Sequence, residues 1–547
     1  MPAPMNTPEL FIPPNSKQVI EIVDADSDFD FELGTKDNFL LISPQANYVV
    51  ENNPDKLNGK ADTILFQSSA FATMPVKRLT REIKKVAEHL NDGGMIIFIL
   101  DNIGRADNIE AILDGKAPTV RATLNFENLV NAIQDAGLIT VKTLARARET
   151  TVRRVVAELA KTQLQLQNFI VAAVKPETAQ IGTTLIHSYI GEKMVCATVR
   201  IHEPNRMIST GVGIILKNEE VQGGSHLEEA GKYNNMIFIN QRVSSFSPEA
   251  GIKTFNDITE RGYLLIEEMD DHPIWWKEKY EQNKFINFIA CHGVQASTDS
   301  LGELFKQFNP NVRVFGNHLS KLPLPRDFDE EAKQDKPVSI LFAALNRDKD
   351  FDEIAPALNE VLAELGDRVE INVIAKRAIF NQIQCPNKNF LGNDNYYEGQ
   401  IVPFEIYEQL LRRTDISLLP LRDVIFNRSK SDLKFIECAG NGAIVLASPV
   451  VYEKSVVDGE TGFIYHDMTE FASKLRLLIT DGDKRRDMAK KAYDYVKYNR
   501  LLSQHYAERI DWYRELLARR DEITAEVRKR LENIDQFADA IAHAWDE

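Results

Sequence analysis

The chain has 547 residues, of which 44% are hydrophobic and 27% are charged, so it is long enough for about three globular domains. Its formal net charge of −16 disfavours nucleic acid as a partner, because general binding to nucleic acid requires clustered Lys and Arg. The four cysteines stand tens of residues apart, a spacing that fits neither a disulfide framework nor a zinc cluster.

Residues 1–16 are rich in proline and polar side chains, and they predict a flexible tail. The sequence contains neither an apolar run of 18 residues nor a signal peptide. We therefore expect a cytoplasmic protein that is not integral to a membrane.

The first domain is expected over residues 17–176, where apolar strand-like runs alternate with helical segments. Strands are expected at 17–24, 38–43, 62–67, 95–101, 138–145 and 169–174, and helices at 75–91, 124–136 and 150–165. Such alternation predicts an α/β domain with a parallel sheet and helices on both faces. The element order, with a closing antiparallel hairpin and the Leu-x-x-Gly-Gly turn at 90–94, resembles that of S-adenosylmethionine-dependent methyltransferases.

The cofactor loop departs from that family. The family follows its first strand with Glu-x-Gly-x-Gly-x-Gly, whose glycines let the backbone approach the cofactor. Here Glu21 is followed by Ile-Val-Asp-Ala-Asp, whose side chains would crowd a ligand. We expect a methyltransferase-like domain that has lost catalysis and serves for docking, with an active but unusual methyltransferase as the alternative.

A second α/β domain is expected over 177–325. Strands are expected at 183–188, 195–201, 236–241, 263–268, 286–291 and 312–316, and helices around 226–232 and at 251–261. The Ser-Thr-x-x-Leu opening at 297–301 and the later Asn317 resemble the acceptor half of GT-B glycosyltransferases. Two prolines and a charged stretch at 327–336 then predict a linker to the next domain.

Several polar side chains of this domain are candidates for contact with an acceptor. They are His187 and Tyr189 after the first strand, and Asp270, Asp271 and His272 in the acidic run after 263–268. Paired carboxylates with an imidazole suit acid–base chemistry or a metal, although an acidic strand end is usually only solvated. Trp275-Trp276 would suit stacking on a sugar ring, but buried packing is the stronger expectation.

The third domain is expected over 326–502. It opens with strand 338–345 and the charged turn Asn346-Arg347-Asp348-Lys349, and continues with strand 370–375 and helix 404–413. The segment 427–447 then reads as a polar loop, a helix at 431–440, a Gly-Asn-Gly break and a buried strand at 443–447. This loop–helix–turn–strand unit is typical of a phosphate-binding crevice at the carboxyl ends of parallel strands.

The chemistry of this unit suits a nucleoside diphosphate. Backbone N–H groups at a helix start attract anions, so Ser429 and Ser431 would cradle a diphosphate, and Lys430 and Lys434 would add full charge. Glu437 is placed to accept both hydroxyl groups of a ribose.

The same residues resemble the large retaining family of GT-B nucleotide-sugar glycosyltransferases. Glu437–Val445 matches the second half of that family's donor motif, and Lys430–Glu437 fits the Lys-Ser-x-x-Lys-x-x-Glu version of one branch. One position departs, because Ser429 stands where the family's first glutamate is expected. In that family the first turn of the domain supplies Arg and Lys to the donor diphosphate, which points to Arg347 and Lys349.

The resemblance implies two opposed Rossmann-like domains that transfer a hexosyl-type sugar from a nucleoside diphosphate sugar to a hydroxyl of a protein or glycan. It implies retention of configuration, with no metal and no cofactor besides the donor. Arg347, Lys349 and Lys430 are the expected catalytic residues, because they would stabilise the departing diphosphate. Two alternatives stay open: a methyltransferase with a sugar-binding partner domain, and a non-catalytic GT-B scaffold.

The last segment, 503–547, predicts C-terminal helices with one apolar stripe. The stripe consists of Leu516, Ile523, Val527, Leu531, Ile534, Phe537 and Ile541. The favoured interpretation is packing against the same chain, and the alternative is a homo-oligomer formed through this helix.

Overall fold

The computed structural model describes residues 11–23, 35–51, 56–67, 74–101, 126–147, 166–179, 182–192, 195–221, 226–331, 336–344, 346–374, 377–391, 402 and 404–546. The chain divides into two compact units. The first contains Met1–Ile186, Asn205–Lys217 and Gly231–Met236, and the second contains His187–Pro204, Asn218–Ala230 and Ile237–Glu547. The predicted cofactor loop after Val23 and the predicted helix 150–165 lie outside the described residues.

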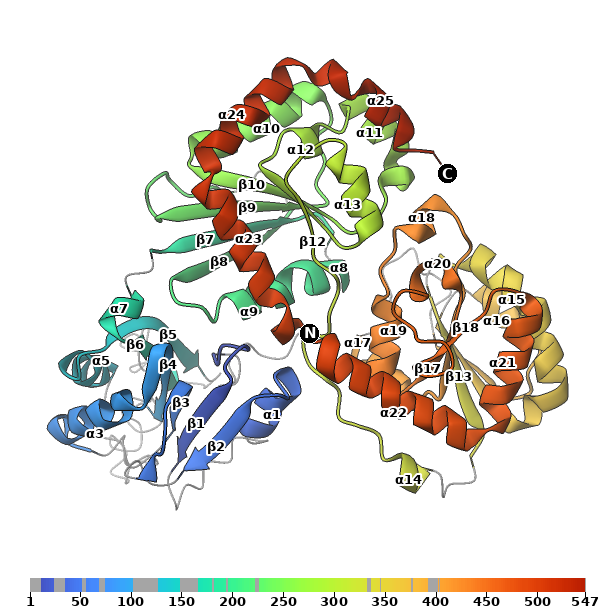
Figure 1. Cartoon of the computed structure of the whole chain (residues 1–547), viewed down its shortest axis with the longest axis horizontal. Helices are drawn as coiled ribbons and strands as arrows, with labels where there is room; N and C mark the ends of the chain where they lie inside the picture. The colour runs from blue at the N-terminus through green and yellow to red at the C-terminus, as the bar shows by residue number, and fades with distance from the viewer. Residues whose placement is uncertain are drawn as a thin grey trace, which may run out of the picture. The chain divides into compact units, whose positions relative to one another are not determined.

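The first unit contains a six-stranded sheet in the order β2-β1-β3-β4-β6-β5 (Figure 1). Its strands are β1 (Gln18–Val23), β2 (Asn47–Glu51), β3 (Ala61–Gln67), β4 (Leu90–Asp101), β5 (Ile139–Ala147) and β6 (Leu166–Val174). The strands from β2 to β4 pair in parallel, whereas β6 pairs antiparallel with both β4 and β5. The closing antiparallel pair expected from the sequence is therefore present.

Helices pack on both faces of this sheet. They are α1 (Thr35–Ile42), α3 (Val76–Glu88), α5 (Phe126–Asp135) and the short α7 (Pro176–Ala179). Because side chains alternate along a strand, Ile64 and Phe66 of β3 face the core shared with α3 and α5, whereas Leu65 faces the core shared with α1. The strand is apolar at all these positions because both of its faces are covered.

Two expectations for the first unit were wrong. Residues 38–43 are not a strand, because Phe39 and Ile42 are buried one helical turn apart on α1. The predicted tail is not wholly flexible, because Phe11 and Ile12 are buried in the core on the α1 side. Ser16 is also fixed there by a contact of 2.9 Å between its Oγ and Thr63 Oγ1.

The second sheet, called here the middle sheet, has the order β12-β11-β10-β9-β7-β8. Its strands are β7 (Thr184–Ile190), β8 (Ile214–Glu220), β9 (Asn235–Gln241), β10 (Tyr263–Met269), β11 (Gly293–Ala296) and β12 (Val312–Val314). The helices between them are α8 (Val195–Ala197), the π-helix η3 (Thr198–His202), α9 (Glu203–Ile208), α10 (Pro248–Glu260), the 3-10 helix η4 (Pro273–Trp276), α11 (Lys277–Asn283), α12 (Ile286–Ile289) and α13 (Asp299–Lys306). Strands β10, β11 and β12 pair in parallel.

Three predicted elements of this region were wrong. Residues 195–201 are helical, because Ala197 and Ile201 are buried at a spacing of four despite the β-branched composition. Residues 286–289 form α12, and the wholly buried run Ile-Asn-Phe-Ile carries no periodicity that separates helix from strand. Residues 226–232 form no helix.

The third sheet, called here the last sheet, is wholly parallel with the order β15-β14-β13-β16-β17-β18. Its strands are β13 (Val338–Ala343), β14 (Val369–Ile374), β15 (Lys388–Phe390), β16 (Ile416–Leu419), β17 (Ile444–Ala447) and β18 (Phe463–Ile464). Its helices are α14 (Phe328–Glu331), α15 (Asp348–Leu365), the 3-10 helix η5 (Gly366–Arg368), α16 (Arg377–Gln382), α17 (Phe404–Leu411), α18 (Ile425–Arg428), α19 (Leu433–Gly440), α20 (Pro449–Tyr452), α21 (Met468–Thr480) and α22 (Gly482–Asn499). One continuous apolar core joins this sheet to α15, α19, α21 and α22.

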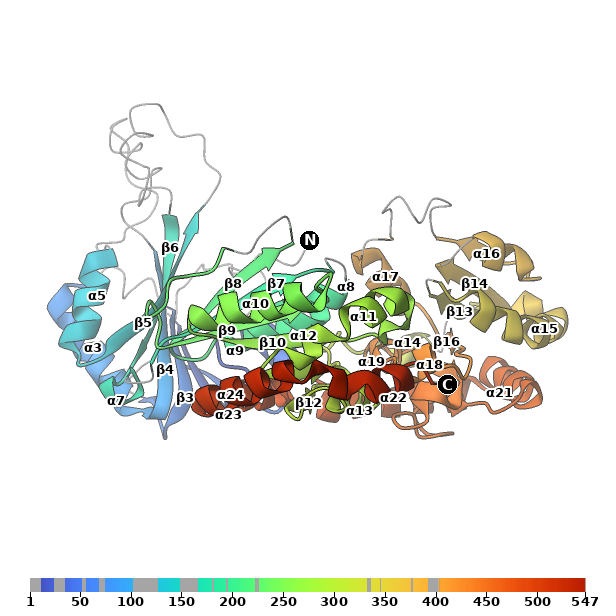
Figure 2. The same ribbon diagram turned by 90° about the horizontal axis from the view of Figure 1, so that it is seen from above.

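The C-terminal segment forms η7 (Leu502–Gln504), α23 (Tyr506–Ala518), α24 (Arg520–Glu532), η8 (Ile534–Phe537) and α25 (Ala538–His543). Figures 1 and 2 show α23 and α24 running along the middle sheet. Tyr513 Oη donates to Gln295 Oε1 of β11 at 2.8 Å, and Leu516, Ile523 and Val527 are buried. The first half of the apolar stripe therefore packs against its own chain.

Over the described residues, none of the helices combines the length and apolarity that crossing a membrane requires.

Candidate active site

Arg347 lies where β13 leads into α15, at the carboxyl edge of the last sheet. The preceding residue, Asn346, has φ 55, a left-handed backbone that costs free energy in a residue other than glycine. The Arg347 guanidinium donates to Asn427 Oδ1 at 2.5 Å and to Asp350 Oδ2 at 3.2 Å. Lys349, in the first turn of α15, is exposed.

Asp350 is the residue that joins this turn to the loop before Lys430, and the sequence reasoning missed it. The carboxylate is buried and accepts from Asn427 Nδ2 at 3.0 Å and from the Arg422 backbone N–H at 2.9 Å. In the sequence it looks like an ordinary acid in the first turn of a helix. The bridge fixes Arg347 beside the segment 422–428, which includes α18.

Glu437, Lys434 and Tyr407 form a hydrogen-bonded triangle between α19 and α17. Tyr407 Oη donates to Glu437 Oε2 at 3.0 Å, and Lys434 Nζ donates to the same oxygen at 3.1 Å and to Tyr407 Oη at 2.9 Å. Burial and the neighbouring Glu437 raise the pKa of Tyr407, so its hydroxyl stays a donor. Glu437 is 5% exposed, whereas the Lys434 side chain is 42% exposed.

The hydroxyl groups of Ser429 and Ser431 contact the middle-sheet region instead of lying free. Ser429 is buried with its Oγ 3.1 Å from Ser300 Oγ, and Ser431 Oγ accepts from Asn317 Nδ2 at 2.8 Å. Helix α19 begins at Leu433, two residues later than expected. Ser429 and Ser431 therefore lie in the loop before the helix, where the regions of the two sheets touch.

Lys430 forms an ion pair that joins the region of the last sheet to the region of the middle sheet. Its ammonium group pairs with Asp271 and lies 4.3 Å from the centre of the Phe426 ring. Burial alone would raise the pKa of Asp271, but Lys430 and Arg242 lower it below its ordinary value. The Lys430 side chain is 25% exposed.

Arg242 holds both aspartates after β10, and the sequence reasoning missed this residue as well. Its Nε lies 2.5 Å from Asp270 Oδ1 and its Nη2 lies 2.6 Å from Asp271 Oδ2. Arg242 has φ 54 directly after β9, so a strained backbone aims this guanidinium. A lone arginine after a strand gave no sequence signal for this role.

The side chains of the acidic run 267–272 do not come together in one site. Glu267 accepts from Asn240 Nδ2 at 2.8 Å, and Glu268 pairs with Arg200 at 2.7 Å, both inside the protein. Burial raises the pKa of Glu267. His272 accepts from the Ile274 N–H through Nδ1, and burial lowers its pKa to about 4. Only the two aspartates of the run share a partner.

His187 and Tyr189 lie in an aromatic cluster of the middle sheet. His187 Nε2 is 2.8 Å from Glu219 Oε2, and its ring meets Phe238 edge-on at 5.0 Å. The Tyr189 ring lies 6.1 Å from that of Phe238. The side chains of His187 and Tyr189 are buried in this cluster. Asp270 and Asp271, by contrast, form ion pairs with Arg242.

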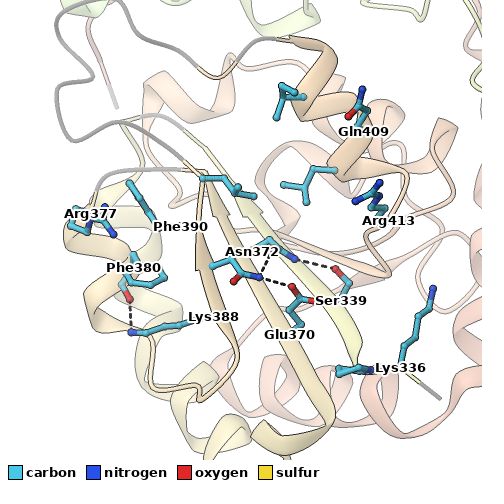
Figure 3. Close-up of a pocket in the computed structure, with 15 residues that line it drawn as sticks. Lys336, Ser339, Glu370, Asn372, Arg377, Phe380, Lys388, Phe390, Gln409 and Arg413 are labelled. Carbon is cyan, nitrogen blue, oxygen red and sulfur yellow. Dashed lines mark hydrogen bonds between the residues drawn. The ribbon is translucent and has the colours of Figure 1, made fainter. Parts of the chain in front are cut away.

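A cavity of about 840 Å³ lies on one face of the last sheet, between α16 and α17 (Figure 3). Its floor is polar, because Asn372 Nδ2 donates to Ser339 Oγ at 3.3 Å and Asn389 Nδ2 donates to Asn372 Oδ1 at 3.2 Å. Helix α17 lines this cavity with other residues, while it turns Tyr407 toward Glu437. The cavity is therefore separate from the Glu437 triangle.

Residues 358–518 match a protein-family model described as glycosyl transferase-like. The match covers less than half of the chain and includes Lys430, Lys434 and Glu437. No curated protein matches the sequence.

Several solved structures are similar to the chain at low identity. HepE of Anabaena with UDP and glucose shares 13% identity over 60% of this chain and 99% of its own, with a TM-score of 0.42. Sucrose-phosphate synthase of Thermosynechococcus elongatus shares 11% over 61% and 99%, with a TM-score of 0.42. A mutant of S. aureus TarM, in complex with Fondaparinux, alpha-GlcNAc-glycerol and UDP, shares 13% over 52% and 55%, with a TM-score of 0.37. The chain thus spans about half the length of TarM.

Proposed function

We propose that this protein is a GT-B glycosyltransferase that moves a hexosyl-type sugar from a nucleoside diphosphate sugar to a hydroxyl of a protein or glycan. The observation that carries the proposal is the Glu437–Lys434–Tyr407 triangle, which lies inside the segment that matches the glycosyl transferase-like model. A carboxylate held in place by two donors, with a half-exposed ammonium beside it, suits a ribose next to a diphosphate.

In this proposal the chain supplies charge and position. Lys430, Arg347 and Lys349 stabilise the negative charge that grows on the diphosphate as the glycosidic bond breaks. Arg347 is held at its buried carboxylate partner Asp350, so its position is set before the donor arrives. The basic groups offset the diphosphate charge without a metal, and the sugar keeps its anomeric configuration.

The acceptor would approach from the middle-sheet region. Asp270 and Asp271 are the best-placed candidates there, because Asp271 already contacts Lys430. His272 caps η4, and His187 and Tyr189 lie in the aromatic cluster, so we give these three a secondary role.

For the first unit we propose a methyltransferase-like domain that docks the acceptor. The order of its sheet and its antiparallel β6 support this proposal. Glu21, which heads the divergent loop, is buried in β1 and accepts from Tyr48 Oη at 2.9 Å. Isothermal calorimetry with S-adenosylmethionine tests the alternative of an active methyltransferase, and we expect no heat of binding.

A thermal-shift panel of nucleotides and nucleotide sugars tests the proposed donor site. A ligand at one hundred times its dissociation constant stabilises the folded state by about 2.7 kcal/mol, so a true donor raises the Tm. If no nucleoside diphosphate or nucleotide sugar raises it, the proposal is wrong.

A non-catalytic GT-B scaffold is the second candidate, and one observation favours it. The side chain at position 429 is a short hydroxyl that contacts Ser300, where the resembled family has a glutamate. Release of free sugar from the stabilising nucleotide sugar, measured with purified protein, would exclude this candidate.

A further inference from the structure

Three large aromatic side chains are exposed in the segments that follow β9 and β10. Phe246 is 81% exposed, Trp275 is 65% exposed and Trp276 is 40% exposed. The expectation that the two tryptophans are buried was therefore wrong. Exposed tryptophan leaves a large apolar area in water, and such groups mark binding sites when they cluster.

These side chains follow two strands that are neighbours in the middle sheet. Phe246 lies in the loop after β9, and Trp275 and Trp276 lie on η4 after β10. The Phe246 loop is fixed, because the Ser245 N–H donates to Asn287 Oδ1 at 2.8 Å and Asn283 Nδ2 donates to the Ser245 carbonyl at 2.9 Å. Phe246 therefore follows a backbone position that is held by two hydrogen bonds.

A short series of contacts joins Trp275 to the proposed diphosphate site. The Trp275 ring packs edge-to-face on Phe426 of α18, with ring centres 5.2 Å apart at 88°. The same Phe426 ring lies 4.3 Å from Lys430 Nζ, and Lys430 pairs with Asp271. Trp275 is thus two contacts away from the charge that is proposed to meet the donor.

The chemistry of this surface distinguishes a sugar from a lipid surface. A pyranose ring has an apolar C–H face and a rim of hydroxyl groups, which match an indole face and nearby carboxylates. An anionic lipid surface requires an excess of Lys and Arg. Here Lys277 lies 3.8 Å from Glu281 and Lys284 lies 2.8 Å from Asp535. Among the described residues this leaves Lys279, 5.3 Å from the centre of the Phe246 ring, as the cation on this surface without an ion pair. The chain as a whole carries a formal charge of −16.

We infer that Trp275, which adjoins the exposed Trp276 on η4, stacks on a pyranose ring of the acceptor, so that the acceptor is a saccharide and not a hydroxyl of a bare polypeptide. This inference rests on the proposed function. It adds the substrate class of the acceptor and a residue that binds it. Asp270 and Asp271 would then accept hydrogen bonds from the hydroxyl groups at the edge of the ring.

The test is retention of the labelled full-length protein on a printed array of oligosaccharides. We expect the wild type to bind one or more saccharides, and Trp275→Ala to weaken that binding about tenfold, which equals about 1.4 kcal/mol. Trp275→Tyr keeps an aromatic face and should recover part of the binding. Tyr498→Ala is the matched control, because Tyr498 is 52% exposed on α22 and should bind as the wild type does.

Equal binding by wild type and Trp275→Ala would overturn the inference. So would binding of the wild type to vesicles of phosphatidylcholine and phosphatidylglycerol that Trp275→Ala abolishes, because the aromatic groups would then serve a lipid surface. The nucleotide thermal-shift panel separates the two proposals. If a nucleotide stabilises the wild type but no saccharide is retained, only the acceptor inference fails, and if no nucleotide stabilises it, the proposed function fails.

Discussion

Arg200 of the middle-sheet region and the lysines Lys430 and Lys434 of the last-sheet region use their charge in opposite ways. In the middle sheet, Arg200 is 1% exposed, and its guanidinium is occupied by Glu268, by Asn317 and by two backbone carbonyl groups. In the last sheet, Lys430 and Lys434 keep a quarter or more of their side chains in solvent. A buried and fully paired cation holds a fold together, whereas a half-exposed cation can exchange its partner for a ligand.

The strongest test of this contrast removes the buried cation. Arg200→Ala leaves Glu268 buried without its partner, and we expect a loss of about 3–5 kcal/mol in the free energy of unfolding. Urea denaturation followed by the fluorescence of tryptophan, including the buried Trp512, measures the change. Lys434→Ala is the comparison and should cost less, because Glu437 keeps the hydrogen bond from Tyr407 Oη. Similar losses in both variants would remove the contrast.

We expect the partly exposed cation Lys430 to affect the turnover number kcat. Lys430→Ala removes one charge from the departing diphosphate, and loss of one such stabilising group costs about 100-fold to 1,000-fold in kcat. The ratio of kcat values at saturating donor, with the dissociation constant of the donor measured in parallel, gives the result. An unchanged kcat would assign Lys430 to structure alone, as would a variant that no longer folds.

A third test measures how the stability of the folded protein depends on pH through His292 of the middle-sheet region. Burial lowers the pKa of His292 to about 4, and its Nδ1 accepts from the Leu265 N–H at 2.9 Å. Between the unfolded pKa near 6.5 and the folded pKa near 4, the unfolded chain binds the extra proton. Stability is therefore full above about pH 6.5 and falls as the pH drops toward 4, by up to about 3 kcal/mol.

Denaturation midpoints at pH 7.5, 6, 5 and 4 measure this pH dependence. The variant His292→Gln cannot gain the proton, so its midpoint should fall less steeply with acid than that of the wild type. Parallel curves for the two proteins would show that other groups control the acid response.

The smallest expected effect concerns the carboxylate of the triangle. Glu437→Gln keeps the shape and a hydrogen-bond acceptor but removes the charge, and we expect weaker donor binding by about 1.5–3 kcal/mol. Calorimetry with the nucleotide identified by thermal shift measures it. Tyr407→Phe is the control, because it removes a partner of Glu437 and leaves the carboxylate in place. Donor affinity equal to that of the wild type in Glu437→Gln would reject the ribose assignment.

The sequence predicted well where strands are apolar on both faces. Runs such as 62–67 and 236–241 were found because a strand covered on two sides is continuously apolar. Prediction failed for Val195–Ile201, whose β-branched composition resembles that of a strand, and for Ile286–Ile289, where a helix is buried all round. The helix of the donor motif was found with its start displaced by two residues.

What the sequence determined by itself is the local chemistry of the last sheet: a charged turn after one strand, and a Lys-x-x-Glu spacing on one helix that brings Lys434 and Glu437 into contact. What only the tertiary structure decided is which groups meet across long separations. Arg242 forms ion pairs with Asp270 and Asp271, and Asp271 also pairs with Lys430. Asp350 accepts hydrogen bonds from both Arg347 and Asn427. Spacing along a helix fixes contacts three and four residues apart, but contacts between separate elements depend on packing and on strained backbone positions that leave no local pattern in the sequence.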